Sequence, residues 1–229
     1  HDDYDSLKLA SISVGKVASS INEAMHQAYK RRKVIDIQDS FYPPIVLVDA
    51  FRTLLKQGTL IKQCRRDFRK YTFFLFNDIL LYASENPVTN TYKLHNKLLI
   101  NNHFMIQDVL DTDVRKNQLK ILSQQKSFIV ICESKNDKLL WYQTLTNAII
   151  NASKRIDKHH QKKNSFIAPI WVTDQEANNC NNCKVYFTLF NRRHHCRCCG
   201  VLVCNSCSKK RMNIIDDTNH SNKEQRICD

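Results

Sequence analysis

The C-terminal part of the chain carries cysteines in closely spaced pairs, and this spacing is typical of metal ligands. Each pair has the form Cys-x2-Cys, and one more cysteine stands just before the end: Cys180 and Cys183, Cys196 and Cys199, Cys204 and Cys207, and Cys228. A Cys-x2-Cys pair turns two thiolates toward a common point, and two such pairs complete the tetrahedral sulfur shell that zinc prefers. Three pairs and a further cysteine therefore predict two zinc sites, with one ligand missing.

Disulfide bonds are the main alternative for so many cysteines. The chain holds ten, and most of them crowd one end as evenly spaced doublets, which favours metal binding over a disulfide framework. Cys198 would form a Cys-x-Cys pair with Cys196, a poorer chelate than the x2 spacing, so we expect it to take no part in the metal sites. Cys64 and Cys132 lie in apolar segments far upstream and are interpreted as small core residues.

A short basic and histidine-rich run lies between two of the cysteine pairs and has the composition of a phosphate site. It reads Arg192-Arg193-His194-His195-Cys196-Arg197. A phosphomonoester carries nearly two negative charges and several acceptor oxygens, so it requires several fixed donors. The arginines supply forked donors, and the histidines supply donors whose charge depends on pH. Metal binding by Cys196 would fix the backbone that presents them, so the run predicts an anion site held in place by zinc.

Residues 171–228 resemble a FYVE domain, a phosphoinositide-binding zinc module of endosomal proteins. Three signatures carry the resemblance: W-x-x-D at Trp171–Asp174, R-[RK]-H-H-C-R at Arg192–Arg197, and R-V-C, with one conservative change, at Arg226–Cys228. The resemblance implies one zinc held by Cys180, Cys183, Cys204 and Cys207, and a second held by Cys196, Cys199 and Cys228. An eighth cysteine is expected just beyond Asp229, so we interpret the module as truncated before this ligand, with His220, Asp229 or water left for the open position.

The same resemblance implies the identity of the bound anion. FYVE domains bind the 3-phosphate of phosphatidylinositol 3-phosphate through the basic run, here Arg192, Arg193, His194, His195 and Arg197. It also implies that Asp174 and Arg226 complete the pocket, and that Asp174 orients a histidine and the inositol hydroxyls.

An apolar pair stands directly before the basic run, in Phe187-Thr188-Leu189-Phe190-Asn191. Such a pair, flanked by arginines in a loop, is an unfavourable choice for the core of a small domain that zinc already organises. FYVE domains insert this loop into the bilayer, which assigns insertion to Leu189 and Phe190 and a core position to Phe187. Burying one leucine and one phenylalanine would contribute about 3 to 6 kcal/mol of gross transfer free energy, so loop and headgroup contacts are expected to share the anchoring.

The overall charge agrees with an anionic partner but does not select one. The formal net charge is +13 and the isoelectric point is near 9.3, which fits a membrane surface or nucleic acid. A nucleic-acid-binding zinc finger is disfavoured because the aromatic residues do not form a base-stacking pattern. A RING-like zinc module of a ubiquitin ligase or a protein-interaction adaptor shares the alternating pairs but lacks the basic run. No segment has the apolar length to cross a bilayer, so any membrane attachment is expected to be peripheral.

Residues 5 to about 38 are predicted to form one long amphipathic helix. Small and apolar residues recur there at spacings of three and four: Ala10, Val14, Val17, Ile21, Ala24 and Ala28. Pro43 and Pro44 cannot continue the helix, which must end at or before Tyr42. Alone it cannot bury its apolar stripe, so we expect it to belong to something larger or to pack on the next domain.

From about Phe51 to Ala152 the pattern changes to short strands and one closing helix. We predict strands at 58–62, 71–76, 79–82, 92–99, 104–106, 118–122 and 128–132, with a hairpin turn at Asn77-Asp78. Seven strands capped by a helix that carries Trp141 resemble a pleckstrin-homology (PH) domain. The string Phe73–Leu81 resembles the form of this domain that follows a Dbl-homology exchange domain.

The first helix then resembles the last helix of a Dbl-homology domain, the catalytic unit of Rho-family exchange factors, through residues 1–4 and 21–23. The order Dbl-homology, PH, FYVE resembles the faciogenital dysplasia class. We therefore expect an α+β multidomain chain with a Dbl-homology helix at 1–40, a PH domain at 51–153, a basic linker at 154–168 and the FYVE module at 169–229. One helix cannot open a nucleotide site, so no catalytic residue is expected and a Rho-family GTPase is expected to bind only the full-length parent.

Two further basic clusters are possible membrane contacts. The first cluster brackets the first hairpin of the PH segment, where lipid-binding members place phosphate ligands: Lys62, Arg65, Arg66, Arg69 and Lys70. A solvated loop is an equal alternative for this cluster. The second cluster lies in the linker and would face an anionic surface: Lys154, Arg155, Lys158, Lys162 and Lys163. The sequence as a whole predicts a phosphatidylinositol 3-phosphate-dependent targeting region of a Rho-family exchange factor, cytoplasmic and peripheral on endosomal or other phosphoinositide-rich membranes.

Overall fold

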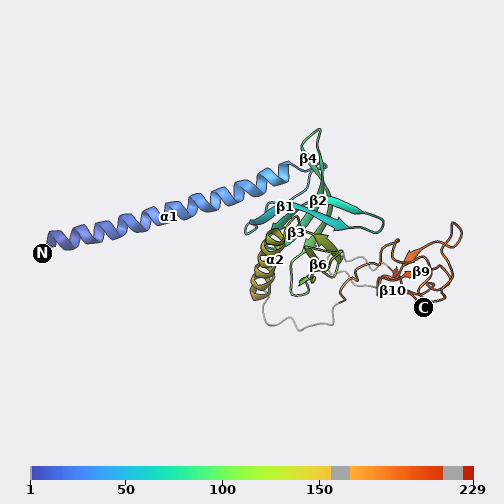
Figure 1. Ribbon diagram of the computed structural model, residues 1–229. Coiled ribbons are helices and arrows are strands. Elements are labelled where there is room, and N and C mark those ends of the chain that lie inside the picture. The colour runs from blue at the N-terminus through green and yellow to red at the C-terminus, as the bar shows by residue number, and fades with distance from the viewer. Residues whose placement is uncertain (1, 156–165, 214–223) are drawn as a thin grey trace.

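A computed structural model describes residues 2–155, 166–213 and 224–229. The predicted linker residues Lys158, Lys162 and Lys163, and the candidate ligand His220, lie outside these described residues. Within these ranges, two helices and eleven strands follow in chain order (Figure 1): α1 (Asp2–Asp39), β1 (Leu54–Gln63), β2 (Phe68–Phe76), β3 (Ile79–Asn86), β4 (Thr91–Leu99), β5 (Met105–Asp108), β6 (Gln118–Leu122), β7 (Phe128–Ile131), α2 (Lys135–Arg155), β8 (His194–His195), β9 (Leu202–Val203), β10 (Arg211–Asn213) and β11 (Glu224–Arg226).

The first seven strands form one antiparallel sheet in the order β4-β3-β2-β1-β7-β6-β5. Neighbours in the sheet are neighbours in the sequence except β1 and β7, which meet when the sheet curls round on itself. Helix α2 then covers the open side (Figure 1). The seven predicted strands and the closing helix are confirmed.

The hairpin between β2 and β3 turns at Asn77-Asp78, as the sequence predicts, with Leu75 opposite Leu80. The Asn77 side chain holds the turn against the start of β1, because its Nδ2 donates to the Phe51 carbonyl at 2.8 Å and its Oδ1 accepts from the Thr53 N–H at 2.9 Å. Residues 71–76 of β2 and 79–83 of β3 are buried on both faces, which explains why this stretch reads as an unbroken apolar run rather than an alternating one.

Two apolar cores use the opposite faces of β2 and β3. On the inner face, Phe73 and Tyr82 pack with Phe128 of β7 and Trp141 of α2. A Cβ at Gly58 of β1 would lie 3.3 Å from the Trp141 ring, so the absence of a side chain there lets α2 lie close to the sheet. Cys132 is buried in this core and Cys64 packs against its edge, as the sequence predicts.

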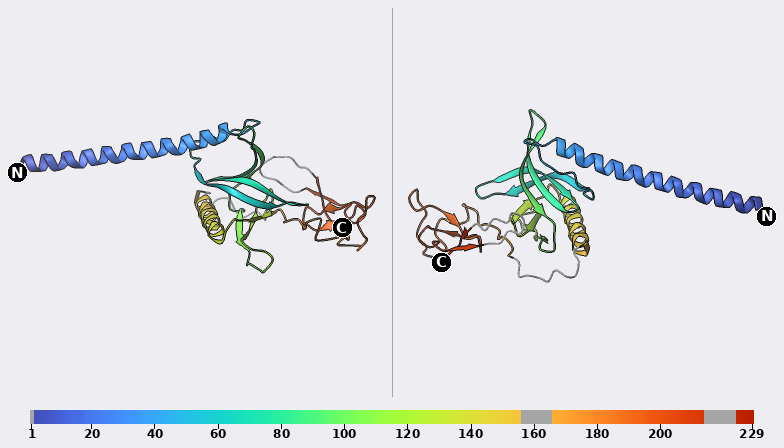
Figure 2. Two further views of the ribbon diagram at one scale, coloured as in Figure 1. Left: turned by 45° about the horizontal axis from the view of Figure 1, so that its top comes forward. Right: turned by 180° about the vertical axis from the view of Figure 1, so that it is seen from behind.

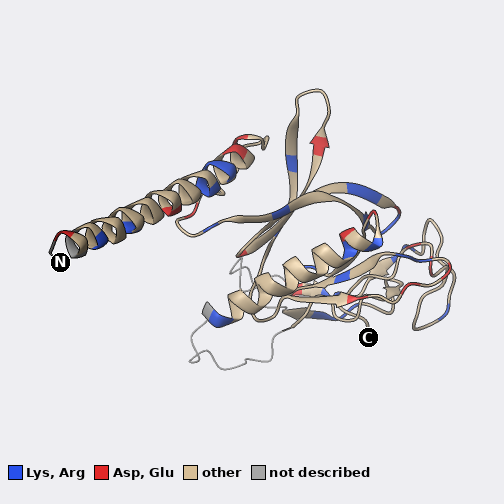
Figure 3. Cartoon of the chain, turned by 60° about the vertical axis from the view of Figure 1, so that its left-hand side comes forward, with Lys and Arg blue, Asp and Glu red and all other residues tan. Residues whose placement is uncertain are grey.

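On the outer face of the hairpin, the end of α1 and the segment after it complete a second core. Val34, Ile37 and Phe41 pack there with Phe74 and Phe76. The helix ends at Asp39, before the two prolines, as predicted. Its remaining length projects away from the barrel (Figures 1, 2 and 3), and its apolar residues Leu7, Val14, Val17, Ile21 and Met25 are exposed. Among the described residues, neither helix has an apolar stretch long enough to cross a bilayer.

The C-terminal segment, residues 166–213 and 224–229, lies beside the barrel on the side away from the free end of α1 (Figures 1 and 2). Its strands are very short, and its apolar cluster is small: Cys180, Phe187, Leu202, Val203 and Cys204. Gly200 has a φ of +82°, and a Cβ there would meet the Ile170 carbonyl oxygen at 2.4 Å. Glycine is therefore required for Pro169 and Ile170 to pass over the cysteine turn that precedes β9.

Candidate functional site

The first group of cysteines comes from two turns that are distant in sequence. The sulfur atoms of Cys180, Cys183, Cys204 and Cys207 all lie within 4.8 Å of one another, and Cys183 Sγ is 3.7 Å from Cys204 Sγ. A tetrahedral zinc with bonds of about 2.3 Å would hold its sulfurs about 3.8 Å apart. The four thiols therefore have the number and spacing of a closed structural zinc site.

The second group alternates with the first along the chain. Cys196, Cys199 and Cys228 place their sulfur atoms within the same limit, with Cys199 Sγ and Cys228 Sγ 3.8 Å apart. Among the described residues, no fourth histidine, cysteine or carboxylate joins this group. Cys198 is exposed and stays outside both groups, as expected. The interleaved pairing is the one that the FYVE resemblance implies.

Backbone amides prepare one thiol in each group for ionisation. Burial raises the pKa of Cys180, but N–H groups of Cys183, Cys204 and Asn182 that donate to its sulfur outweigh burial and lower the pKa to about 6. In the same way, the N–H groups of Cys199, Cys228 and Cys198 lower the pKa of Cys196 to about 7 against the effect of burial. Hydrogen bonds with neighbouring thiols raise the pKa of Cys207, and those with Cys196 and Cys199 raise the pKa of Cys228, to about 12 in each case. A bound divalent cation would compensate several thiolates in one place, which fits zinc.

The basic run stands between these two groups. His194 and His195 form β8, which pairs with Leu202 and Val203 of β9. Cys196 of one cysteine group follows His195 directly and Cys204 of the other follows Val203, so both groups adjoin this pair of strands. The N–H of Arg197 donates to the Arg226 carbonyl at 2.9 Å. The structure therefore brings the basic run beside the R-I-C signature, although they are far apart in sequence.

Trp171 organises the end of the run. Its ring stacks on His195 with centroids 4.5 Å apart, and the Arg197 guanidinium lies over it at 4.2 Å. His195 is buried, and its Nε2 makes a 2.7 Å hydrogen bond with the Val172 carbonyl. Burial lowers the pKa of His195, and burial together with Arg226, Arg65, Arg211 and Arg192 lowers the pKa of His194. Partial burial lowers the pKa of Arg197, although the residue as a whole remains exposed. The histidines thus favour the neutral form.

The loop before β8 exposes the two residues assigned to membrane insertion. Leu189 is 87% exposed and Phe190 is 99% exposed, whereas Phe187 is buried beneath them. Arg192 Nε donates to the Leu189 carbonyl at 3.3 Å, which ties the first arginine of the run to the loop. The Arg193 guanidinium lies 5.1 Å from the centre of the Phe187 ring. The loop therefore exposes two apolar side chains next to a cation that is hydrogen-bonded to it.

Comparisons with known proteins support this geometry. Residues 170–229 match the model of the FYVE zinc finger, and residues 48–148 match that of the SOS1/NGEF-like PH domain. Over 99% of its length the chain is 33% identical to FYVE, RhoGEF and PH domain-containing protein 6 of Homo sapiens, of which it spans 16%. It is 35% identical to Pleckstrin homology domain-containing family F member 2 of Gallus gallus, over 78% of the chain and 69% of that protein.

The chain belongs to the family of PH–FYVE proteins. Its relatives include the FYVE, RhoGEF and PH domain-containing proteins, and FYVE and PH domains together mark it as a peripheral membrane-targeting region. A solved structure of autoinhibited Vav1 shares the fold over 82% of the chain and 31% of that chain, with 16% identity and a TM-score of 0.52. The predicted PH-type barrel, FYVE module and zinc cofactor are confirmed.

Asp174 of the FYVE module pairs with an arginine of the PH barrel. Its carboxylate accepts from Arg65 Nε, which lies 2.9 and 3.0 Å from the two oxygens, and its N–H donates to the Arg65 carbonyl at 2.9 Å. Arg66 lies 3.7 Å from the same carboxylate. The Arg115–Glu176 ion pair at 3.3 Å adds a second contact between the barrel and the module. The turn between β1 and β2 therefore docks directly on the W-x-x-D signature.

The basic set assigned to the PH domain does not converge on one point. Arg65 and Arg66 turn to Asp174, Arg69 pairs with Asp67 at 2.8 Å, and Lys70 is exposed on β2. Lys62 instead is buried, with its ammonium 4.8 Å from the Phe128 ring. Arg226, assigned to the headgroup pocket, donates to Asn205 and to both oxygens of Ser208.

Sequence reasoning missed the residues that join the two domains. The pairing of Arg65 with Asp174 spans 109 positions, and no local pattern indicates it. Trp171 was identified as a signature residue, but its stacking against both His195 and Arg197 was not predicted. Lys126, which lies near the contact between the domains, has no motif around it that would have marked it.

Proposed function

We propose that the FYVE module binds phosphatidylinositol 3-phosphate and holds the chain on endosomal membranes as the targeting region of a Rho-family exchange factor. One observation carries this proposal: a basic strand fixed by two cysteine groups stands beside a loop whose Leu189 and Phe190 are almost fully exposed. A headgroup and a bilayer would meet these two features from the same side.

The headgroup contacts follow from the chemistry of the run. Arg192, Arg193 and Arg197 would supply the charge-assisted donors to the 3-phosphate, since guanidinium groups present several N–H groups in a fixed plane. His194 and His195 would add further donors from β8. Arg226 and Asp174 would complete the pocket, with Arg226 held by Ser208 and Asp174 by Arg65. Zinc supplies no reaction here; it fixes the backbone that carries these side chains.

The N-terminal helix is proposed to be the last helix of a Dbl-homology domain. Its exposed apolar stripe, residues 7–29, would be covered by the rest of that domain in a longer protein, and the human relative has RhoGEF in its name. We propose that exchange on a Rho-family GTPase is a property of such a parent, and that residues 1–229 alone are not an enzyme. In the PH domain, the exposed Arg66 and Lys70 are proposed as secondary contacts with an anionic membrane.

Sedimentation with phosphatidylcholine vesicles tests the lipid assignment. Wild-type protein should sediment with vesicles that contain phosphatidylinositol 3-phosphate and remain in solution with vesicles that contain phosphatidylinositol 4-phosphate at the same charge density. Replacing Arg193 or Arg197 by Ala should remove a charge-assisted donor and weaken binding by about 1.5 to 3 kcal/mol, both to vesicles and to the soluble headgroup. Equal sedimentation with both lipids would reject the proposed specificity.

A matched pair of loop variants separates insertion from headgroup binding. Leu189→Ala with Phe190→Ala should weaken vesicle binding and leave binding to soluble inositol 1,3-bisphosphate almost unchanged, since only apolar burial is lost. Val185→Ala with Tyr186→Ala, which removes exposed apolar groups outside the loop tip, is the control and should behave like the wild type. Equal losses of vesicle and headgroup binding in the loop variant would show that Leu189 and Phe190 do not act as a membrane anchor. Zinc content and circular dichroism verify folding.

A further inference from the structure

The PH barrel holds a residue that the proposed function assigns to the headgroup pocket of the FYVE module. The Asp174 carboxylate accepts from Arg65 Nε at 2.9 and 3.0 Å, and the Asp174 N–H donates to the Arg65 carbonyl at 2.9 Å. The Asp174 side chain is 16% exposed, so little of it is left for a second partner. An inositol hydroxyl that binds this carboxylate therefore has to replace Arg65.

The two residues that follow Asp174 also contact the barrel. Gln175 Nε2 donates to the Arg66 carbonyl at 3.2 Å, and Glu176 pairs with Arg115 at 3.3 Å. Arg66 belongs to the β1–β2 turn and Arg115 to the segment between β5 and β6, so two separate parts of the barrel hold the end of the W-x-x-D signature. The contact of Asp174 is thus part of the docking of the two domains and not an isolated ion pair.

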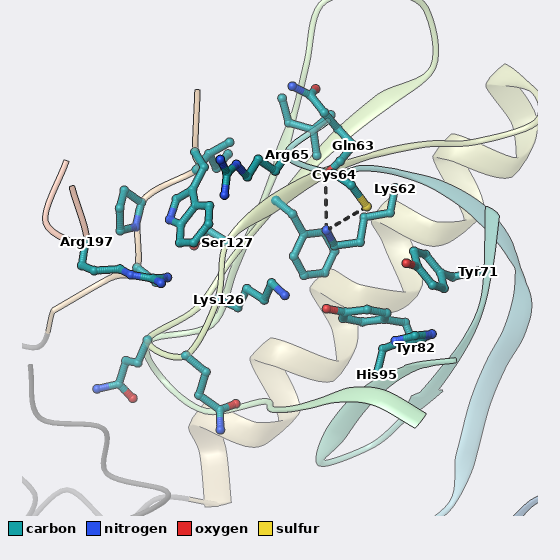
Figure 4. Close-up of a pocket in the computed structure, with 18 of the residues that line it drawn as sticks. Lys62, Gln63, Cys64, Arg65, Tyr71, Tyr82, His95, Lys126, Ser127 and Arg197 are labelled. Carbon is teal, nitrogen blue, oxygen red and sulfur yellow. Dashed lines mark hydrogen bonds between the residues drawn. The ribbon is translucent and has the colours of Figure 1, made fainter. Parts of the chain in front are cut away.

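A second residue of the assigned pocket, Arg197, faces the docked barrel across a cavity of about 500 Å³. Figure 4 shows Arg65, Lys62 and Lys126 of the barrel and Arg197 of the module on the walls of this cavity. Among the described residues, no aspartate or glutamate lines it, so the barrel brings cations rather than acids toward Arg197. Like charges around one cavity weaken the docked arrangement.

The contact between the domains is mainly polar. Within the described part of the chain, the apolar core of the barrel and that of the module share no residue. The Arg65 side chain is 40% exposed, and ion pairs at such positions contribute little to stability. Domains that meet through a small polar interface are expected to separate and to dock again. The docked arrangement is therefore weak enough for a ligand of the module to displace it.

We propose that the β1–β2 turn of the PH domain autoinhibits the FYVE module: while Arg65 holds Asp174 the headgroup binds weakly, and full binding requires the two domains to separate. This inference rests on the proposed function, because it concerns the same pocket. Docking and headgroup binding exclude each other at Asp174, so each lowers the apparent affinity of the other by the same factor. Asp174 completes the headgroup pocket only after Arg65 has released it. A membrane that contains the headgroup therefore converts the chain from a closed to an open form.

Binding of soluble inositol 1,3-bisphosphate to the zinc-loaded full chain, measured by titration calorimetry, tests the autoinhibition. Arg65→Ala removes the partner of Asp174 and should tighten binding by about two- to fivefold, the factor that an ion pair of this exposure can contribute. Arg69→Ala is the matched control, because it removes the same charge nearby from a pair with Asp67 and should bind like the wild type. Unchanged affinity in Arg65→Ala would reject the autoinhibition. Weaker binding would make Arg65 a ligand of the headgroup and would reject it as well.

A charge exchange between Arg115 and Glu176 gives an independent test, because neither residue is assigned to the headgroup or belongs to a cysteine group. Arg115→Glu sets two carboxylates together, so it should loosen the docking and tighten headgroup binding by about two- to fivefold. Loss of positive charge by itself would weaken the binding of an anion, so the expected sign is specific to the proposal. Arg115→Glu with Glu176→Arg should restore the wild-type affinity. Glu176 also accepts from the Thr173 N–H, so zinc content is checked in the double variant, and weaker or unchanged binding in Arg115→Glu alone contradicts the proposal.

The reciprocal effect is measured on the shape of the chain. Saturating inositol 1,3-bisphosphate should raise the radius of gyration of the wild type in small-angle scattering, toward that of Arg65→Ala. An unchanged radius at saturation would mean that the headgroup binds the docked chain, and would overturn the competition. Absence of binding in the wild type and in every variant would reject the proposed function together with the autoinhibition. Equal binding by the wild type and Arg65→Ala would reject the autoinhibition alone.

Discussion

The PH barrel and the FYVE module reach a defined structure by different physical means. The barrel encloses an apolar core that runs from Phe73 and Tyr82 to Trp141 of α2. Among its described residues, the module gathers only a small apolar cluster around Phe187, Leu202, Val203 and some of its cysteines, and its strands contain two or three residues each. So small a core cannot offset the conformational entropy of folding, and metal binding has to supply the difference.

Because of this difference, the two domains expose different kinds of side chain to a ligand. In the barrel, side-chain packing leaves the basic residues at the turns free to pair with acids such as Asp67 and Asp174. In the module, the two cysteine groups adjoin the basic strand β8 and its partner β9, and Leu189 and Phe190 stay exposed. A structure held by metal can therefore place apolar side chains outward, because it does not need them for its core.

Zinc removal is expected to have the largest effect, and it should affect the FYVE module but not the PH barrel. Chelation should unfold residues 170–229, since binding free energies of about 10 to 16 kcal/mol are typical of structural zinc and are linked to folding. The PH barrel should keep its fold, as judged by the unchanged amide resonances of residues 54–131. Cys180→Ser should reproduce the loss, and Cys198→Ser, which changes a cysteine outside both groups, should retain zinc. Fewer than one zinc per chain in freshly folded protein would contradict the assignment.

A substitution in the core of the PH barrel should have the converse effect on the two domains. Phe73→Ala removes a fully buried ring from the core and should lower the free energy of unfolding of the PH domain by about 3 to 5 kcal/mol. Zinc content should be unaffected, because the module does not depend on that core. Thermal unfolding followed by near-ultraviolet circular dichroism, together with metal analysis, measures both properties. Loss of zinc in this variant would mean that the two domains fold as one cooperative unit.

The ion pair between the domains should have a smaller effect on stability. Arg65→Ala or Asp174→Asn breaks a partly exposed pair, so the coupling free energy from the double-mutant cycle should be at most about 1 kcal/mol. The arrangement of the domains should respond more strongly, with an increased radius of gyration in small-angle scattering. Arg69→Ala, which breaks an exposed pair with Asp67 within the PH domain, is the control. An unchanged radius in both Arg65 and Asp174 variants would show that other contacts fix the domains.

The weakest expected effect concerns pH and His95 of β4. Burial lowers the pKa of His95, and Lys93, Lys126, Arg69 and Lys62 lower it further, while Tyr71, Tyr82 and Ser84 are its neutral neighbours. The folded barrel therefore disfavours the charged imidazole, so the free energy of unfolding of the PH domain should fall as pH drops through the imidazole range. The decrease should be small, and smaller still in His95→Gln, as measured by urea unfolding at a series of pH values. Identical pH profiles for the two proteins would show that His95 does not contribute.

Local sequence was sufficient to predict those structural features whose physical cause is local. The Cys-x2-Cys spacing predicts the ligand turns because two thiolates three residues apart reach one metal ion. Asn77 and Asp78 predict the β2–β3 turn, and Pro43 and Pro44 predict where α1 stops, since these residues restrict their own backbone. The exposed position of Leu189 and Phe190 followed from the FYVE resemblance, as did the interleaving of Cys196 and Cys228 into one group.

Only the tertiary structure decided how the two domains meet. Curling of the sheet joins β1 to β7 and brings Lys126 beside Lys62, although neither position has a distinctive neighbour in sequence. Docking of the β1–β2 turn places Arg65 on Asp174 and leaves Arg197 facing a cavity of the barrel. Ion pairs and cavities depend on the relative position of distant segments, and charge along the chain carries no information about that position. The sequence therefore determined the metal groups and predicts the anion-binding chemistry, and the packing of the domains decided which cations pair with acids.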